Sequence, residues 1–317
     1  MRKGQNPAKF INQVAKPENV TVAVLNYIPF VSGFYEKMPE VLKLCLNSIW
    51  DNTDVPYDLM VFDNGSCQEV KDFLVQAQDQ GKIQYLILSE KNLGKGGAWN
   101  IIFDAAPGEI IAYTDNDAYF YPGWLSKSLQ ILEAYPRAGM VTSRPFRTKE
   151  ELYTKTIEWA ETNPEVTFEK GRFLPWEIYR DFAMSLGTSE EQAREWFETG
   201  VGDIRLTYQG VCAFVGASHW QFVSRKSILK EFLPFDMTRP MGQVRMLDER
   251  INQSGYLRLM TSEPLAQNMS NEPKLQPDAI KNLETGGLSF KKRVANTPLI
   301  KNTLLAVYNQ IFKLYYG

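Results

Sequence analysis

The feature that most constrains this chain is a polar triplet at the end of an apolar stretch. Asp115, Asn116 and Asp117 follow residues 109–114, whose composition predicts a short buried strand. In open α/β sheets, ligands bind beyond the carboxyl ends of the strands. Two carboxylates at such a place suit Mg²⁺ or Mn²⁺, and the same cation would also bind a diphosphate. Because Asp and Asn are also common in plain turns, the triplet alone does not decide between a metal site and a turn.

The first half of the chain alternates predicted strands with predicted helices. Apolar and β-branched runs indicate the strands, and apolar residues at helical spacing indicate the helices between them. The strands are 20–25, 57–62, 83–88 and 109–114, and the helices are 38–50, 68–80 and 96–105. This alternation implies βαβ units, and so an α/β fold with a mostly parallel central sheet flanked by helices. The polar loops that follow the strands should then meet at one edge of the sheet.

The pattern changes after residue 143. Residues 144–209 are charged and aromatic and indicate a helical insertion, with helices at 149–162 and 189–199. Further strands are predicted at 139–143, 210–216, 219–223 and 257–260, with helices at 125–134 and 248–254. We therefore expect an N-terminal extension (1–19), a domain at 20–285 made of a nucleotide-binding half (20–143), the insertion (144–209) and an acceptor-side half (210–285), and a C-terminal helical tail (286–317).

The tail is basic, and residues 302–316 carry apolar side chains at helical spacing. Such a helix could dock its apolar stripe on the domain or on a second copy of the chain in a homodimer. It could also lie on a membrane surface, because basic amphipathic helices bind there. The sequence leaves these alternatives open.

Composition excludes several classes of function. The formal net charge is −2, so no basic field indicates nucleic acid as a partner. Cys45, Cys67 and Cys212 are too widely spaced for a zinc pattern, and they predict free thiols in a reducing cytoplasm. The single histidine, His219, argues against a multi-histidine metal site. Beside aromatic neighbours it is either a packed core residue or part of the acceptor side.

Four loops that follow strands carry a series of motifs. Asn26 and Tyr27 follow the first strand, and the later segments are VFDNGS, KNLGKGGAWN and AYTDNDAYFYPGW. In order and spacing this series resembles the family 2 glycosyltransferases, well over residues 20–141 and more weakly over 211–271. The resemblance implies a single nucleotide-sugar transferase domain of the GT-A type, and a reaction that inverts the anomeric carbon.

The resemblance also implies roles for individual residues. Asp63 would accept the imide hydrogen of a uracil or thymine base, and Lys95 would offer a cation to the diphosphate. A divalent cofactor, Mn²⁺ or Mg²⁺, would be held by Asp115 and Asp117, with Asn268 at the place of a histidine found in many relatives. The residues expected to bind the nucleotide sugar are Asn26, Tyr27, Asp63, Asn92, Gly94, Lys95, Asn100, Asp115 and Asn116.

The base that activates the acceptor hydroxyl is expected on a short helix before Gly255. Asp248 is the first candidate and Glu249 the second. Adjacent helical residues point about 100° apart, so both are not expected to face the sugar. Many relatives carry their acid pair a few residues earlier, where this chain has Gln243 and Val244.

The predicted function is transfer of a sugar from a nucleoside diphosphate donor, linked to UDP, dTDP or GDP, to a hydroxyl group. The acceptor would be a glycan such as a growing polysaccharide, a lipid-linked glycan or a protein, in the cytoplasm or at the inner face of the membrane. One alternative is a module that binds nucleotide sugars without turnover. A nucleotidyltransferase is a second alternative, but such enzymes usually have a basic, glycine-rich loop where this chain has residues 26–30.

Overall fold

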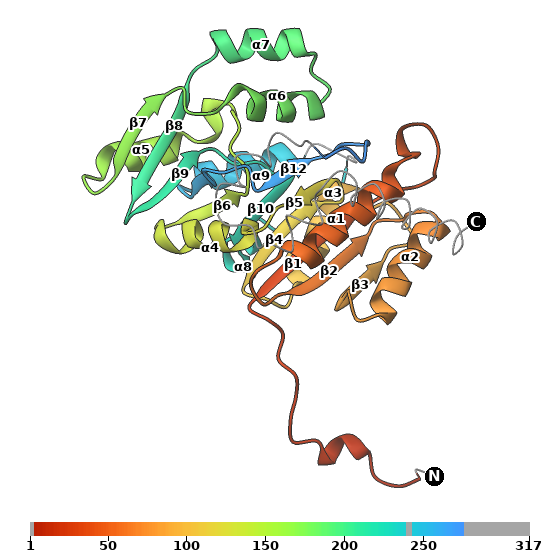
Figure 1. The fold of residues 1–317 in the computed structure, drawn as a ribbon. Coiled ribbons are helices and arrows are strands. Elements are labelled where there is room, and N and C mark those ends of the chain that lie inside the picture. Colours follow the sequence, from red (N-terminus) through yellow and green to blue (C-terminus); the bar gives the residue numbers. More distant parts are fainter. Residues whose placement is uncertain (1–2, 239–242, 276–317) are drawn as a thin grey trace, which may run out of the picture. The chain divides into compact units, whose positions relative to one another are not determined.

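A large β-sheet organises the computed structural model, which describes residues 3–238 and 243–275 (Figure 1). The predicted α/β fold, with helices flanking a central sheet, is confirmed. The tail at 286–317, its helix at 302–316 and the boundary at 285 lie outside the described residues. Across the sheet the strands follow the order β3 (Tyr85–Leu88), β2 (Asp58–Asp63), β1 (Val20–Asn26), β4 (Ile110–Asp115), β10 (Gln221–Arg225), β6 (Ala138–Thr142), β11 (Leu257–Met260), β9 (Val211–Val215), β8 (Asp203–Tyr208) and β7 (Thr167–Gly171).

The part of the sheet from β3 to β4 is parallel, as predicted. Its strands are connected by α1 (Met38–Asn52), α2 (Gln68–Asp79) and α3 (Gly94–Ala105). Every residue of β1 is buried, which is expected of a central parallel strand with helices on both faces. This part of the fold brings the carboxyl ends of β1, β2 and β4 to one edge.

Beyond β4 the sheet is mixed. β10 runs antiparallel to both β4 and β6, β11 runs parallel to β6, and β9, β8 and β7 continue antiparallel. On one face, α3, α8 (Lys226–Lys230) and α9 (Gln243–Gln253) cover a core of aromatic and aliphatic side chains. The rings of Trp99, Phe103, Tyr113 and Phe222 contact one another in this core. α4 (Trp124–Ala134) packs against β6 and β10.

The insertion at 144–209 is partly helical and also extends the sheet. It contains η3 (Glu150–Leu152), α5 (Thr154–Thr162), α6 (Trp176–Ser185) and α7 (Glu190–Thr199), and Figure 1 shows α6 and α7 beside the edge formed by β7 and β8. The strands β7 and β8 were not predicted from the sequence. β7 is an edge strand whose side chains are at most half-buried, so it lacks the apolar run that indicates a core strand.

Short elements complete the described chain. η1 (Pro7–Phe10) lies in the N-terminal extension and η2 (Gly33–Tyr35) follows β1. β5 (Ala118–Phe120) and β12 (Ala266–Asn268) form a separate two-stranded sheet just beyond β4. Within residues 3–238 and 243–275, we find no helix with the length and apolar character needed to cross a bilayer.

The core around α3 makes a prediction about stability. Phe222→Ala should lower the free energy of unfolding by about 3–5 kcal/mol, because it removes a fully buried ring and leaves a cavity. Urea denaturation measures this change. Phe10→Ala is the matched control: that ring is 70% exposed, so the expected change is within about 0.5 kcal/mol. Equal effects of the two substitutions would contradict the packing described.

Candidate active site

The carboxyl ends of three parallel strands meet at one edge of the sheet. The register of β1 against β2 pairs Asn26 with Asp63, and the register of β1 against β4 pairs Leu25 with Asp115. The sequence motifs that follow these strands are therefore neighbours in space. A cavity of about 370 Å³ opens above them, lined by Leu25, Tyr27, Phe34, Tyr35, Met38, Asn64, Asn92, Gly94, Lys95, Asp115, Asn116, Asp117 and Ser270. We call it the first cavity.

A buried polar network lies beneath the first cavity. The Asn26 amide donates to Asp63 Oδ1 at 2.7 Å and to Ser66 Oγ at 3.0 Å, and Asp63 Oδ2 accepts from the Ser66 backbone at 3.0 Å. Asn116 Nδ2 donates to Asn26 Oδ1 at 2.7 Å. Asn26 and Asp63 are fully buried, and neither lines the cavity. The structure therefore places Asp63 under the wall of the site, while its neighbour Asn64 faces the cavity.

Asn64 fixes the glycine-rich loop at the start of α3. Its Oδ1 accepts from the Leu93 backbone at 2.9 Å, and its Nδ2 donates to Asn92 Oδ1 at 3.0 Å. Asn92 Oδ1 also accepts from the Gly94 backbone at 2.8 Å. Gly94 has a φ of 69°, a left-handed conformation that glycine adopts without strain. The loop thus brings the N-terminus of α3 and Lys95 to the wall of the cavity.

Asp115 has partners for both carboxylate oxygens. Lys95 Nζ lies 2.6 Å from Oδ2, and the Tyr113 hydroxyl donates to Oδ1 at 2.6 Å. Burial, and then the charge of Asp115, raise the pKa of Tyr113 well above its ordinary value, so this phenol remains a donor. Asp115 is therefore held in one orientation at the cavity.

Asp117 is the carboxylate that lacks a full set of partners. Its Oδ1 atom is buried and has no hydrogen-bond partner among the described residues. Burial, and next the charge of Asp115, raise the pKa of Asp117 to about 7, while Lys95 opposes this shift. A buried carboxylate oxygen without a donor is costly unless a cation or a proton binds it. Asp115 and Asp117 therefore fit a hard divalent cation, which would take its other ligands from water and a diphosphate.

Two predicted site residues lie away from the first cavity. Asn100 donates to the Phe235 carbonyl at 3.0 Å and accepts from the Phe235 backbone at 2.6 Å, so it holds the segment after α8. Asn268 lies on β12 opposite Ala118, and its Oδ1 accepts from the Ser270 backbone at 2.7 Å. That turn places Ser270, rather than Asn268, at the cavity wall. Tyr27, Asn92, Gly94, Lys95, Asp115, Asn116 and Asp117 are brought together as predicted.

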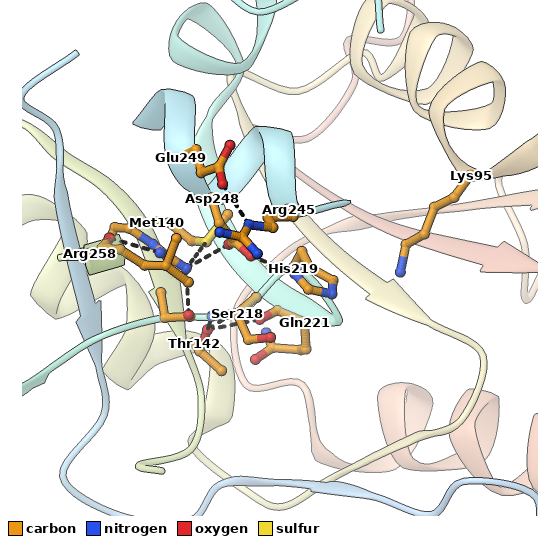
Figure 2. A network of polar contacts seen from close by, with 12 residues as sticks. Lys95, Met140, Thr142, Ser218, His219, Gln221, Arg245, Asp248, Glu249 and Arg258 are labelled. Carbon is orange, nitrogen blue, oxygen red and sulfur yellow. Dashed lines mark hydrogen bonds and ion pairs between the residues drawn. The ribbon is translucent and has the colours of Figure 1, made fainter. Parts of the chain in front are cut away.

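The two predicted base candidates lie in different surroundings on α9. Asp248 is buried, and its oxygens contact Arg258 Nη2 at 2.5 Å and His219 Nδ1 at 2.6 Å (Figure 2). Glu249 accepts from Arg245 Nε at 2.6 Å and does not line the first cavity. The helix starts at Gln243, five residues before the predicted start, and this places Asp248 well inside it.

For His219 the sequence left two alternatives open, a packed core residue or part of the acceptor side. In the structure His219 is only partly buried, with 30% of its side chain exposed. It lies in the loop before β10 and borders a second cavity of about 440 Å³, lined by Phe146, Arg147, Lys149, Glu151, Leu152, Phe182, Leu186, Ser218, His219, Trp220, Arg245 and Asp248. The Asp115 backbone donates to the Trp220 carbonyl at 2.9 Å, so this loop joins the end of β4.

Comparison with known proteins gives partial matches along the chain. The family model for glycosyl transferase family 2 matches residues 31–188. An uncharacterized glycosyltransferase of Nostoc sp. is 28% identical over 100 residues, which are 32% of this chain and 31% of the relative. The succinoglycan biosynthesis protein ExoW of Rhizobium meliloti is 25% identical over 107 residues, 33% of this chain and 34% of that protein. The chain thus spans about a third of the length of the curated relatives that it matches.

Solved structures show weaker similarity. A mannosyltransferase from Pyrobaculum calidifontis in complex with GDP-Man and Mn²⁺ has a TM-score of 0.46 at 16% identity, covering 79% of this chain and 56% of that one. TarS 1-349 of S. aureus in complex with UDP-GlcNAc has a TM-score of 0.45 at 13% identity, covering 89% and 68%. The assignment depends instead on the family model and on the ordered motifs. Together, the family model, the curated relatives and the ordered motifs support a family 2 glycosyltransferase.

Proposed function

We propose that this chain transfers a sugar from a nucleoside diphosphate donor to a hydroxyl group of an acceptor by direct, inverting displacement. The observation that carries the proposal is the first cavity, where a buried carboxylate oxygen of Asp117 without a partner lies in the same wall as Asp115 and Lys95. A cation and a diphosphate would supply the charges that this wall lacks.

The nucleoside would occupy the aromatic side of the first cavity. Tyr27, Phe34 and Tyr35 offer ring faces for a base, and the amide nitrogen of Asn92 can donate to its edge. Asp63 has both oxygens engaged beneath this wall. We therefore propose that Asp63 holds the wall through Asn26 and Ser66, in place of the direct base contact that the resemblance implies.

The diphosphate would lie between α3 and the end of β4. The N-terminus of an α-helix favours an anion, and at α3 Lys95 adds a positive charge at the same place. Asp115 and Asp117 would hold the divalent cation, which neutralises charge on the leaving diphosphate when it is bound. With the carboxylate of Asp115 engaged by the cation, Lys95 would be free to contact the phosphates.

The acceptor would occupy the second cavity. Its rings, Phe146, Phe182 and Trp220, can pack against sugar faces, and Lys149 and Arg245 can donate to hydroxyl or anionic groups. A growing polysaccharide is the acceptor we favour, since one relative is named for succinoglycan biosynthesis. A lipid-linked glycan or a protein with a sugar already attached presents the same chemistry.

The donor proposal is tested by thermal shift with UDP-, dTDP- and GDP-sugars, with and without Mn²⁺. A true donor at one hundred times its Kd should stabilise the protein by about 2.7 kcal/mol. Asp117→Asn should lose the share of this stabilisation that depends on Mn²⁺, because the substitution removes a carboxylate from the cation site. The variant should also no longer release the nucleoside diphosphate.

Asp79→Asn is the matched control for this change, since Asp79 is exposed at the end of α2. Full Mn²⁺-dependent stabilisation in Asp117→Asn would contradict the metal assignment. Tight binding of a donor with no release of nucleoside diphosphate would favour the non-catalytic module.

The raised pKa of Asp117 makes a prediction about pH. Its carboxylate must lose a proton to bind the cation, so Mn²⁺-dependent affinity should fall about tenfold per pH unit below pH 7 and level off above it. Without metal, the folded state keeps a proton that the unfolded chain loses near pH 3.8, so stability is lost as pH rises from 3.8 to about 7.

Asp117→Asn should therefore stabilise the metal-free protein at pH 8 and have less effect at pH 4. Urea denaturation at both values measures the difference, with Asp79→Asn as the reference. A gain that is the same at both pH values would show that Asp117 titrates normally.

A further inference from the structure

A chain of three polar contacts leads from the protein interior to the second cavity. Arg258 is fully buried, and its Nη2 lies 2.5 Å from Asp248 Oδ1. Asp248 Oδ2 lies 2.6 Å from His219 Nδ1, and the His219 side chain is 30% exposed at the cavity. In Figure 2, His219 lies at the border of this network, on the side of Lys95. The three residues come from β11, α9 and the loop before β10.

Asp248 is poorly placed to take a proton from an acceptor. Its side chain is 5% exposed, and each of its oxygens already contacts a neighbouring nitrogen. Arg258 cannot move aside, because its Nη1 donates to the Leu152 carbonyl at 2.8 Å and its Nη2 donates to the Ala217 carbonyl at 2.6 Å. The carboxylate is therefore fixed between the guanidinium and the imidazole.

The contact with Asp248 determines which ring nitrogen of His219 can accept a proton. A carboxylate that accepts from Nδ1–H leaves the lone pair on Nε2. No described residue pairs with Nε2, and the ring borders the second cavity. The lone pair of His219 Nε2 can therefore take a proton from a substrate hydroxyl bound in the second cavity.

The loop that carries His219 is held rigidly beside the donor site. Ser218 donates from its backbone to Thr142 Oγ1 at 2.9 Å, and Thr142 Oγ1 donates to the Gln221 carbonyl at 3.0 Å. The Trp220 carbonyl accepts from the Asp115 backbone. His219 is therefore one residue away from the backbone contact with the strand end that would hold the diphosphate.

We propose that His219 is the catalytic base of the transfer and that Asp248 is its positioning residue. The proposal rests on the proposed function. As the acceptor oxygen bonds to the anomeric carbon, its proton passes to the lone pair of His219 Nε2. The bond from that carbon to the phosphate oxygen breaks, and its electron pair leaves with the nucleoside diphosphate. The imidazolium then returns the proton to solvent, and Asp248 stabilises its positive charge in the meantime.

Other charged groups around the second cavity do not replace this base. Arg147, Lys149 and Arg245 are cations, and Glu151 contacts Arg245 at 3.2 Å. None of these cations can accept a proton, and the carboxylate of Glu151 is already paired with Arg245.

The test follows release of nucleoside diphosphate from the donor that scores best in the thermal-shift panel, with saturating Mn²⁺. His219→Asn keeps an amide that can donate to Asp248 but removes the proton acceptor. With water as the attacking nucleophile, we expect kcat for release of the nucleoside diphosphate to fall at least about 100-fold. The Kd of the donor should change less than about twofold. His219→Gln serves as a second variant, and Asp79→Asn should behave as wild type.

Azide separates a lost base from a disturbed site. Azide attacks the anomeric carbon without losing a proton, forms a glycosyl azide and expels the diphosphate. Release supported by azide should therefore remain within about threefold of wild type in His219→Asn. A loss with azide as deep as the loss with water would show a structural role and overturn the proposal.

The pH profile supplies a third readout. The ratio of water-supported to azide-supported release cancels the effect of pH on metal binding, because both reactions need the same donor complex. In wild type this ratio should fall as the pH is lowered, because a protonated imidazole has no lone pair left to accept the proton. In His219→Asn the ratio should be low and flat.

The outcomes are distinct. Water-supported turnover near the wild-type level in His219→Asn would overturn the assignment and leave the proposed function intact. If Glu249→Gln loses water-supported release while His219→Asn keeps it, Glu249 is the base. A wild-type protein that releases no nucleoside diphosphate from any donor, with water or azide, would contradict the proposed function and the base together.

Discussion

The pairing of β4 with β10 is the contact on which the candidate site depends. These strands are antiparallel, so the carboxyl end of β4 meets the amino end of β10, and the Asp115 backbone donates to the Trp220 carbonyl at 2.9 Å. One strand end carries the two acidic residues of the first cavity. The loop that precedes the other carries His219 at the second cavity. A parallel strand at this place would have brought its carboxyl end here instead, and the loop that carries His219 would not meet the end of β4.

Most polar groups at this edge of the sheet are already satisfied. Asn26, Asp63, Ser66 and Asn116 bond to one another beneath the first cavity, so the loops above them are held before any ligand binds. Asp117 differs, because one of its oxygens is buried without a partner among the described residues. A satisfied network surrounding one unsatisfied oxygen is the arrangement expected where an external ligand completes the site.

The sequence predicted the parallel half of the sheet and most of the first cavity, because both follow from local patterns. Apolar runs marked β1, β2, β3 and β4, and polar loops marked their ends. It did not show that Asp63 turns inward while Asn64 faces the cavity, since that depends on the partner Asn26, 37 residues away. Edge strands such as β7 lack an apolar run, so they gave no signal. The pair of His219 with Asp248 joins residues 29 apart through tertiary packing, and no periodicity encodes it.

The energetics of Arg258 and Asp248 favour a role beyond stability. A buried ion pair gains little over a well-packed apolar pair, because desolvation of both charges offsets their attraction. Here the pair is incompletely satisfied as well, since Arg258 Nε lacks a partner among the described residues. Burial lowers the pKa of Arg258, and the carboxylate of Asp248 opposes that shift. An apolar pair could fill this part of the core equally well, but it could not hold a protonated Nδ1 and leave Nε2 open at the cavity. Removal of either charge would leave the other buried and unpaired, so a loss of folding in such a variant reports on the pair and not on the chemistry. Substitution at His219, which is partly exposed, avoids that penalty and isolates the step in which the proton moves.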